Sequence, residues 1–128
     1  MKDSVMQWWR YSGAFLICTA VFHLLFGTFV GIPALRGIVS EGIYNTIGTD
    51  LERNAVVWFL VSGVLLLLLG QFARYYTRQH DRPVPRFVGW YLLVTSIAGI
   101  VLIPLSGFWL LFPQGLLILL APGPEPQA

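Results

Sequence analysis

Residues 54–73 read NAVVWFLVSGVLLLLLGQFA, a continuous stretch without a charged side chain. A helix needs about 20 predominantly apolar residues to cross the hydrocarbon layer of a bilayer. Similar apolar stretches occupy 11–32 and 87–105, and a shorter one occupies 107–121. Backbone within lipid must satisfy its own hydrogen bonds, which leaves helices and closed barrels as the possible structures. None of these stretches alternates strictly between apolar and polar residues, as barrel strands do. The sequence therefore predicts membrane helices.

The composition supports the same prediction. Hydrophobic residues make up 56% of the 128-residue chain, charged residues only 11%, and the mean hydropathy is +0.71. An ordinary soluble domain carries roughly a quarter charged residues. A chain this short leaves much of its surface exposed, so its apolar side chains cannot all be buried in one core. We expect lipid to be part of its solvent.

The predicted fold is all-α, a single four-transmembrane-helix bundle over residues 1–121. Its approximate spans are 11–32, 51–75, 87–105 and 107–121, followed by a disordered, proline-rich tail at 122–128. Thr49 and Glu52 match a capping box at the start of the second helix. Small residues at helical spacing in the first two helices, including Gly13 and Gly70, should let those helices approach closely.

Charge distribution predicts the orientation. Six of the eight basic residues fall on one side of a four-span arrangement: Lys2, Arg10, Arg74, Arg78, Arg82 and Arg86. The opposite side, formed by the connection between the first two spans and the start of the second span, holds only Arg36 and Arg53, beside several acidic residues. The positive-inside rule makes the basic side, and hence both termini, cytoplasmic. The same arginines are explained by topology and anionic headgroups, so we expect no nucleic-acid partner.

The outer connection, residues 33–50, is too apolar to be a freely solvated loop. Leu35, Val39, Ile43 and Ile47 recur every four residues and would form one apolar stripe on a short helix. Such a helix either lies in the membrane interface or folds back over the bundle as a lid. Both alternatives remain open from the sequence.

His23 is the ionisable residue that lies at membrane depth in the first predicted span, where burial is costly without a partner. It is either a structural residue, hydrogen-bonded to Ser62, Thr95 or Gln114, or a cavity residue that moves a proton or binds a polar ligand group. In the second case Glu41, in the outer connection, or Glu52, at the start of the second span, would supply a carboxylate for acid–base chemistry.

The catalytic candidates are therefore His23, Glu41 and Glu52. Glu52 has the alternative of a helix cap, and Arg53 is expected to pair with Glu41 or Asp50. Four further residues with polar or aromatic side chains are candidates for substrate binding: Asn54, Trp58, Tyr91 and Gln114. No metal site and no cofactor is expected, and the single cysteine, Cys18, excludes an internal disulfide.

Three local patterns carry a family resemblance: His23 with Gly27 in the first helix, Glu52-Arg53 leading to Trp58-Phe59, and the run from Pro104 to Gly115. On these residues the chain resembles an uncharacterised family of small bacterial four-helix membrane proteins, over most of residues 10–121. The resemblance implies the four-helix fold and a bacterial inner (plasma) membrane location. It implies no activity.

Two functional classes follow. The first is a non-catalytic membrane module: an accessory subunit, channel or carrier that works with a membrane partner or as a homo-oligomer. The second is a small membrane enzyme, an isomerase, cyclase or hydrolase, that acts on a lipid-soluble small molecule through histidine and carboxylate groups. We favour the first class. The second class rests on an analogy with membrane isomerases, which use acid–base pairs in helical bundles, and not on any similarity of sequence.

Overall fold

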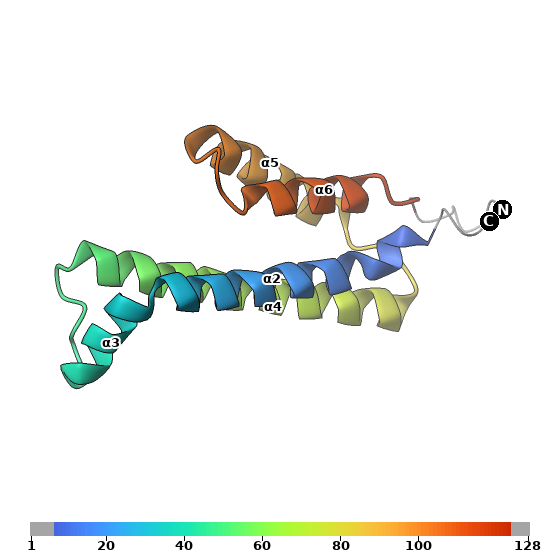
Figure 1. Ribbon diagram of the computed structural model, residues 1–128. Helices are drawn as coiled ribbons and strands as arrows, with labels where there is room; N and C mark the ends of the chain where they lie inside the picture. The colour runs from blue at the N-terminus through green and yellow to red at the C-terminus, as the bar shows by residue number, and fades with distance from the viewer. Residues whose placement is uncertain (1–6, 124–128) are drawn as a thin grey trace.

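The computed structural model describes residues 7–123 and contains no strand within them. Lys2 and most of the predicted tail, residues 124–128, lie outside the described range. The elements in chain order are η1 (Trp8–Tyr11), α2 (Ser12–Val30), α3 (Ile32–Ser40), α4 (Leu51–His80), α5 (Arg86–Leu102) and α6 (Phe108–Leu119), as Figure 1 shows. The predicted all-α class is confirmed.

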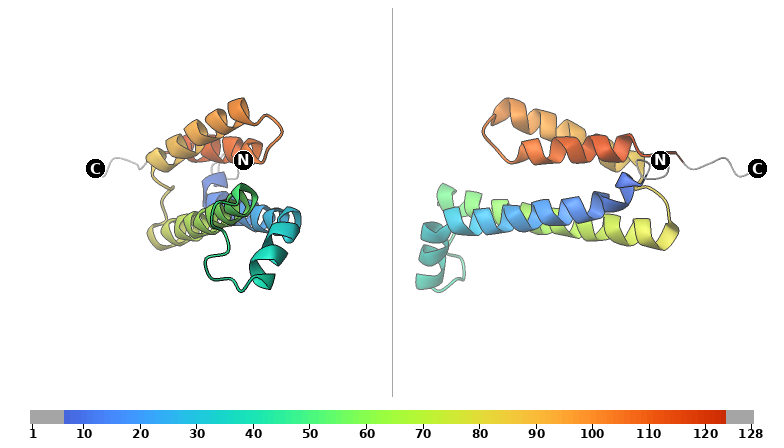
Figure 2. Two further views of the ribbon diagram at one scale, coloured as in Figure 1. Left: turned by 90° about the vertical axis from the view of Figure 1, so that its left-hand side faces the viewer. Right: turned by 45° about the vertical axis from the view of Figure 1, so that its right-hand side comes forward.

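The helices form two antiparallel hairpins. α2 packs along α4 and α5 packs along α6, while the hairpins meet mainly through α2 and α6 (Figures 1 and 2). α3 turns away at the far end of the long hairpin and contacts α2 and α4. The buried apolar cluster draws on both hairpins and on the connection between them: Leu16, Ala73, Val84, Val88, Leu92 and Ile118.

Glycines set the close approach of α2 and α4. A Cβ atom at Gly13 would collide with the backbone of Arg74, and one at Gly70 would lie 2.8 Å from the backbone nitrogen of Ile17. Neither contact leaves room for a side chain, because the obstacle is backbone rather than a movable side-chain end. The prediction that small residues bring these two helices together is confirmed.

The start of α4 differs from the predicted capping box. Asp50, not Thr49, is the N-cap residue, and its Oδ1 accepts from the backbone N–H groups of Glu52 (3.0 Å) and Arg53 (3.1 Å). A carboxylate is the stronger acceptor and also complements the positive end of the helix dipole. The prediction of Thr49 as the cap was wrong by one residue.

The end of α4 also lies beyond its expected position near residue 75. The helix continues to His80, where Asp81 adopts a left-handed conformation (φ 47°). Pro83 and Pro85 follow and prevent further helix. The polar character of residues 76–80 suggested an earlier end, but a helix can continue into a polar environment once its hydrogen-bond ladder is established.

The outer connection is helical only in its first part. α3 includes Leu35 and Val39, whereas Ile43 has a φ of 68° and, like Ile47, lies outside the helix. Of the four residues of the expected apolar stripe, only Leu35 and Val39 therefore lie on a helix. The glycines Gly42 and Gly48 both have positive φ and turn the chain back toward α4.

We predict that Gly70→Ala destabilises the α2–α4 hairpin. Alanine gains about 1 kcal/mol in helix propensity, but overpacking against fixed backbone costs about 1–3 kcal/mol, so the variant should unfold at lower temperature. Thermal unfolding of the purified full-length chain, followed by circular dichroism, measures the change. Gly107→Ala is the matched control, because nothing lies within 4 Å of the added atom. Equal stability of Gly70→Ala and wild type would contradict this account of the packing.

Candidate functional site

His23 on α2 is held by α4. Its Nε2 lies 2.9 Å from the Phe59 carbonyl oxygen and 3.2 Å from Ser62 Oγ, and its ring stacks on the Phe59 ring with centroids 3.8 Å apart. Ser62 Oγ itself donates to the Phe59 carbonyl at 2.7 Å. Of the partners proposed from the sequence, Ser62 is the one present.

These contacts determine the tautomer of His23. A carbonyl oxygen only accepts, so Nε2 must carry the proton that it shares with Phe59. In the neutral ring, Nδ1 then keeps a free lone pair, for which residues 7–123 supply no hydrogen-bond donor. His23 is thus both a bridge between two helices and a potential acceptor.

Glu41 is engaged by Arg53 and not by His23. The Arg53 guanidinium donates through Nη1 to Glu41 Oε2 (2.7 Å) and through Nη2 to Glu41 Oε1 (2.6 Å). Its Nε lies 3.2 Å from Asp50 Oδ2, and Nη1 also donates to the carbonyl of Thr46 at 2.6 Å. The expected pairing of Arg53 is therefore present with both carboxylates. The bidentate geometry ties the connection after α3 to the first turn of α4.

The hydrogen bonds from Arg53 hold the pKa of Glu41 below its ordinary value of 4.5, and the attraction between the charges adds to this effect. Desolvation opposes the shift, but its effect on the pKa is smaller than that of the hydrogen bonds. The carboxyl group is consequently ionised at neutral pH. A general acid needs a raised pKa, so the ion pair disfavours that role for Glu41.

The other candidates at the start of α4 do not converge on His23. Glu52 contributes its backbone N–H to the Asp50 cap, and Asn54 donates its backbone N–H to the Asp50 carbonyl. Trp58 is exposed on α4, and Tyr91 is exposed on α5. No side-chain hydrogen bond within residues 7–123 joins His23 to Glu41 or Glu52. The structure distributes these residues rather than assembling them.

Gln114 has a different position, in the contact between the two hairpins. Its Nε2 donates to Thr19 Oγ1 (2.6 Å) on α2 and to the Leu110 carbonyl (2.7 Å), while Oε1 is buried without a partner in the described chain. The contact between Gln114 and Thr19 is the only side-chain hydrogen bond that joins the two hairpins among residues 7–123. Thr19 was not a site candidate, because nothing local in the sequence shows that α6 lies beside it.

The described pocket lies elsewhere. It is a shallow groove of about 550 Å³ on α3, lined by Ile32, Leu35, Arg36, Val39 and Ser40. None of the sequence-derived site residues lines it. Among residues 7–123 there is also no group of three or more His, Cys, Asp or Glu side chains that could hold a metal ion.

We predict that acid loosens the connection between α3 and α4. Because Arg53 lowers the pKa of Glu41, its stabilising contribution is present above the unfolded value and is lost as pH falls through the lower folded value. The exchange protection of amides in residues 41–50, measured relative to the intrinsic exchange rate at each pH, should therefore fall below about pH 4.5 in wild type.

In Glu41→Gln the same residues should exchange faster than in wild type at neutral pH, and their protection should depend less on acid. Glu52→Gln is the matched control, because its side chain has no hydrogen bond within the described chain. Exchange that is equally slow in wild type and Glu41→Gln would show that the ion pair does not hold this connection.

Comparison with known proteins identifies a family whose function is unknown. A family model described as "Family of unknown function (DUF6463)" matches residues 7–123. No curated protein and no solved structure matches the chain. The match includes the segments around His23, Arg53 and Pro113 on which the resemblance was drawn. The chain belongs to the family of unknown function DUF6463.

Proposed function

We propose that the chain is a four-span integral protein of the bacterial inner membrane that serves as a non-catalytic accessory module. The observation that carries the membrane part is the exposure of its most apolar helices. Trp8–Val30 and Leu51–His80 are long and apolar enough to cross a bilayer, yet only 22% and 11% of their most apolar windows are buried. Helices in the core of a soluble protein would be mostly buried.

The distribution of residue size supports the same setting. Along α2 and α4 most of the buried residues are small, among them Gly13, Ala20, Gly70 and Ala73, with Leu16 as the large exception, whereas many phenylalanine, leucine and tryptophan side chains of these helices are exposed. Lipid-facing helices pack in this way because lipid tails solvate large apolar side chains as well as a protein core does.

The proposal includes α5 and α6 as the third and fourth spans. With 17 and 12 residues, they are about 26 and 18 Å long. Both helices are shorter than the ~30 Å hydrocarbon layer, α6 the more so, and apolar residues on either side of α6, such as Leu105 and Leu120, continue the apolar segment beyond the helix. Trp109 Nε1 donates to the Pro104 carbonyl at 2.8 Å, which satisfies one backbone group in the turn between the helices.

The arrangement of the hairpins supports both termini on one side. Because each hairpin is antiparallel, the start of α2 and the end of α6 lie at the same end as the α4–α5 connection (Figure 1). Contacts between η1 and α6 agree with this placement. That end carries the excess of arginine, so the positive-inside rule favours a cytoplasmic location for it.

The polar contacts favour a non-catalytic role. The two groups that acid–base chemistry needs are bound separately, His23 by α4 and Glu41 by Arg53. Three of the buried polar side chains, Thr77, Ser96 and Gln114, hydrogen-bond a carbonyl three or four residues earlier in their own helix. They do not form a continuous polar path, so an accessory role is favoured over a channel in a single copy.

Cysteine labelling tests the membrane topology. In a Cys18→Ser background, Tyr44→Cys in the outer connection should react with a membrane-impermeant maleimide in intact cells. Gln79→Cys, near the end of α4, should react only after the membrane is permeabilised. Both side chains are exposed, so a difference in their labelling reports the side of the membrane on which each residue lies and not a difference in burial. Labelling of both sites from outside, or the reverse pattern, would refute the proposed arrangement.

One observation favours the alternative of a membrane enzyme: the free acceptor at His23 Nδ1. We expect mass spectrometry of molecules co-purified in mild detergent to give the same small-molecule profile for wild type and His23→Ala, because His23 acts as a bridge between helices. Ser62→Ala is the control, because it removes the longer contact of His23 Nε2 but keeps Nδ1 and the hydrogen bond to the Phe59 carbonyl. A molecule lost from His23→Ala but retained by Ser62→Ala would instead indicate a binding site at the ring.

A further inference from the structure

We propose that the chain binds the headgroups of anionic phospholipids at one end, between the end of α4 and the start of α5. We call this surface the arginine end and define it as Arg74, Arg78, Arg82 and Arg86. The inference rests on the proposed membrane setting and adds to it a lipid class and a binding surface.

The first step is the balance of charge at the two ends. At the outer end, Arg53 is neutralised by Glu41 and Asp50. At the opposite end, the carboxylate of Asp81 is 2.7 Å from Arg10. Within residues 7–123, the four guanidinium groups of the arginine end have no ion-pair partner. Only this end therefore presents a group of unpaired positive charges in the described chain.

The second step is that the fold gathers these charges. Arg74 and Arg78 are one helical turn apart on α4, Arg82 follows the end of the helix, and Arg86 begins α5. All four side chains are exposed. Val84, between the last two, is only 3% exposed and belongs to the buried apolar cluster. It anchors the connection, so that Arg82 and Arg86 extend from a fixed backbone rather than from a free loop.

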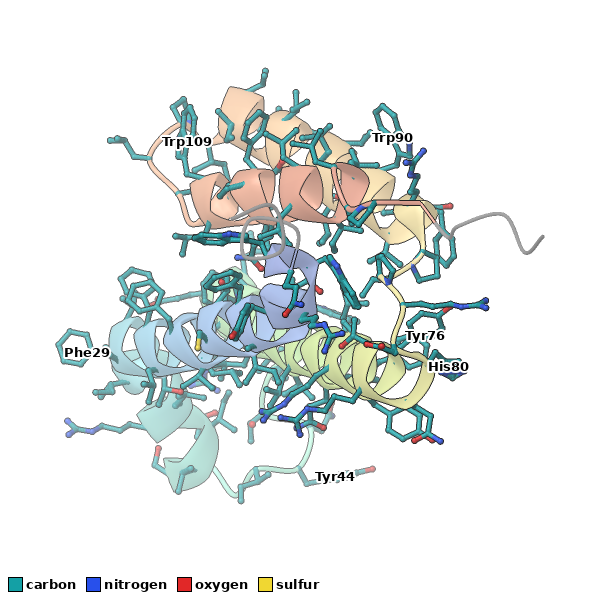
Figure 3. All side chains as sticks on the ribbon, turned by 90° about the vertical axis from the view of Figure 1, so that its right-hand side faces the viewer. Phe29, Tyr44, Tyr76, His80, Trp90 and Trp109 are labelled. Carbon is teal, nitrogen blue, oxygen red and sulfur yellow. The ribbon has the colours of Figure 1, made fainter. Side chains whose placement is uncertain are left out.

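The third step places the charges at headgroup level. Tyr75, Phe87 and Trp90 are exposed beside the arginines, and Trp90 lies one turn after Arg86 on α5. Figure 3 shows Trp90 on the outer surface of α5, and Tyr76 with His80 at the end of α4. Exposed tryptophan and tyrosine collect where the apolar layer meets the headgroups.

The chemistry of the side chain then selects the ligand. A guanidinium group donates two parallel hydrogen bonds to phosphate oxygens and stays charged at every relevant pH. A zwitterionic headgroup brings its own cation to the site, whereas an anionic headgroup brings uncompensated negative charge. Clustered arginines directly beside a membrane helix consequently favour anionic lipids.

Trp90 supplies a reporter for the experiment. The full-length chain with Trp90 as its single tryptophan is reconstituted in phosphatidylcholine vesicles that contain a minor fraction of brominated lipid. The brominated lipid is either phosphatidylglycerol or phosphatidylcholine, at equal amounts. We expect Trp90 fluorescence to be quenched roughly threefold more by the phosphatidylglycerol. Molar salt should abolish the difference, since it shortens the screening length to about 3 Å.

The controls use both ends of the molecule. A chain with Trp58 as its single tryptophan, on α4 toward the outer end, should be quenched equally by the two lipids. The triple substitution Arg78→Gln, Arg82→Gln and Arg86→Gln should remove the excess at Trp90, whereas Arg36→Gln should preserve it. Circular dichroism checks that each variant keeps its helices, and the wild-type chain is assayed in parallel for retained phosphatidylglycerol by mass spectrometry.

The outcomes separate this inference from the proposed function. Equal quenching of Trp90 by both lipids, with no retained phosphatidylglycerol on the wild-type chain, overturns the headgroup site but leaves the membrane setting intact. Absence of quenching at both Trp90 and Trp58 means that the helices are not in contact with lipid. That result overturns the membrane proposal and this inference together.

Discussion

The close backbone contact between α2 and α4 is the constraint on which the rest of the structure depends. Gly13 and Gly70 allow it, because each faces backbone of the opposite helix at a distance that excludes a Cβ atom. The contact aligns His23 with Phe59 and Ser62 and fixes the frame on which α6 packs. Small-residue packing supplies the helix contact that, in lipid, the hydrophobic effect does not.

The two ends of this frame differ in how they treat charge. The outer end closes on itself, with Arg53 bound to Glu41, Asp50 and the Thr46 carbonyl. The opposite end leaves most of its guanidinium groups available to surrounding molecules. A closed network stabilises a local conformation, whereas open charges create an external field. The molecule is thus polar along its long axis although its middle is almost free of charge.

Much of the fold could be predicted from sequence because apolar length and glycine spacing are local signals. The pairing of Arg53 with Glu41 and Asp50 was also predictable, since three complementary charges lie in one short connection. The Gln114–Thr19 hydrogen bond was not, because it joins residues 95 positions apart and depends on how one hairpin packs on the other. Thr49 and Asp50 are adjacent and both can cap a helix, so the capping-box pattern alone placed the cap one residue too early, although the carboxylate of Asp50 is the stronger acceptor. The sequence candidates for binding failed to converge for the same reason: spacing along α4 and α5 does not specify which faces meet.

The uncharged part of α4 has a fixed length that can be compared with the thickness of a bilayer. Arg53 and Arg74 bracket its uncharged part and are 21 residues apart, which corresponds to about 32 Å along a helix. In the proposed setting, the ion-paired Arg53 and the Arg74 guanidinium both lie outside the apolar layer, without tilting of α4, when that layer has nearly this dimension. A thinner bilayer would require α4 to tilt and a thicker one would require local compression, each at a modest cost per ångström. In that setting, a chain whose uncharged helix has this fixed length is expected to accumulate in membrane regions of matching thickness, independently of any partner.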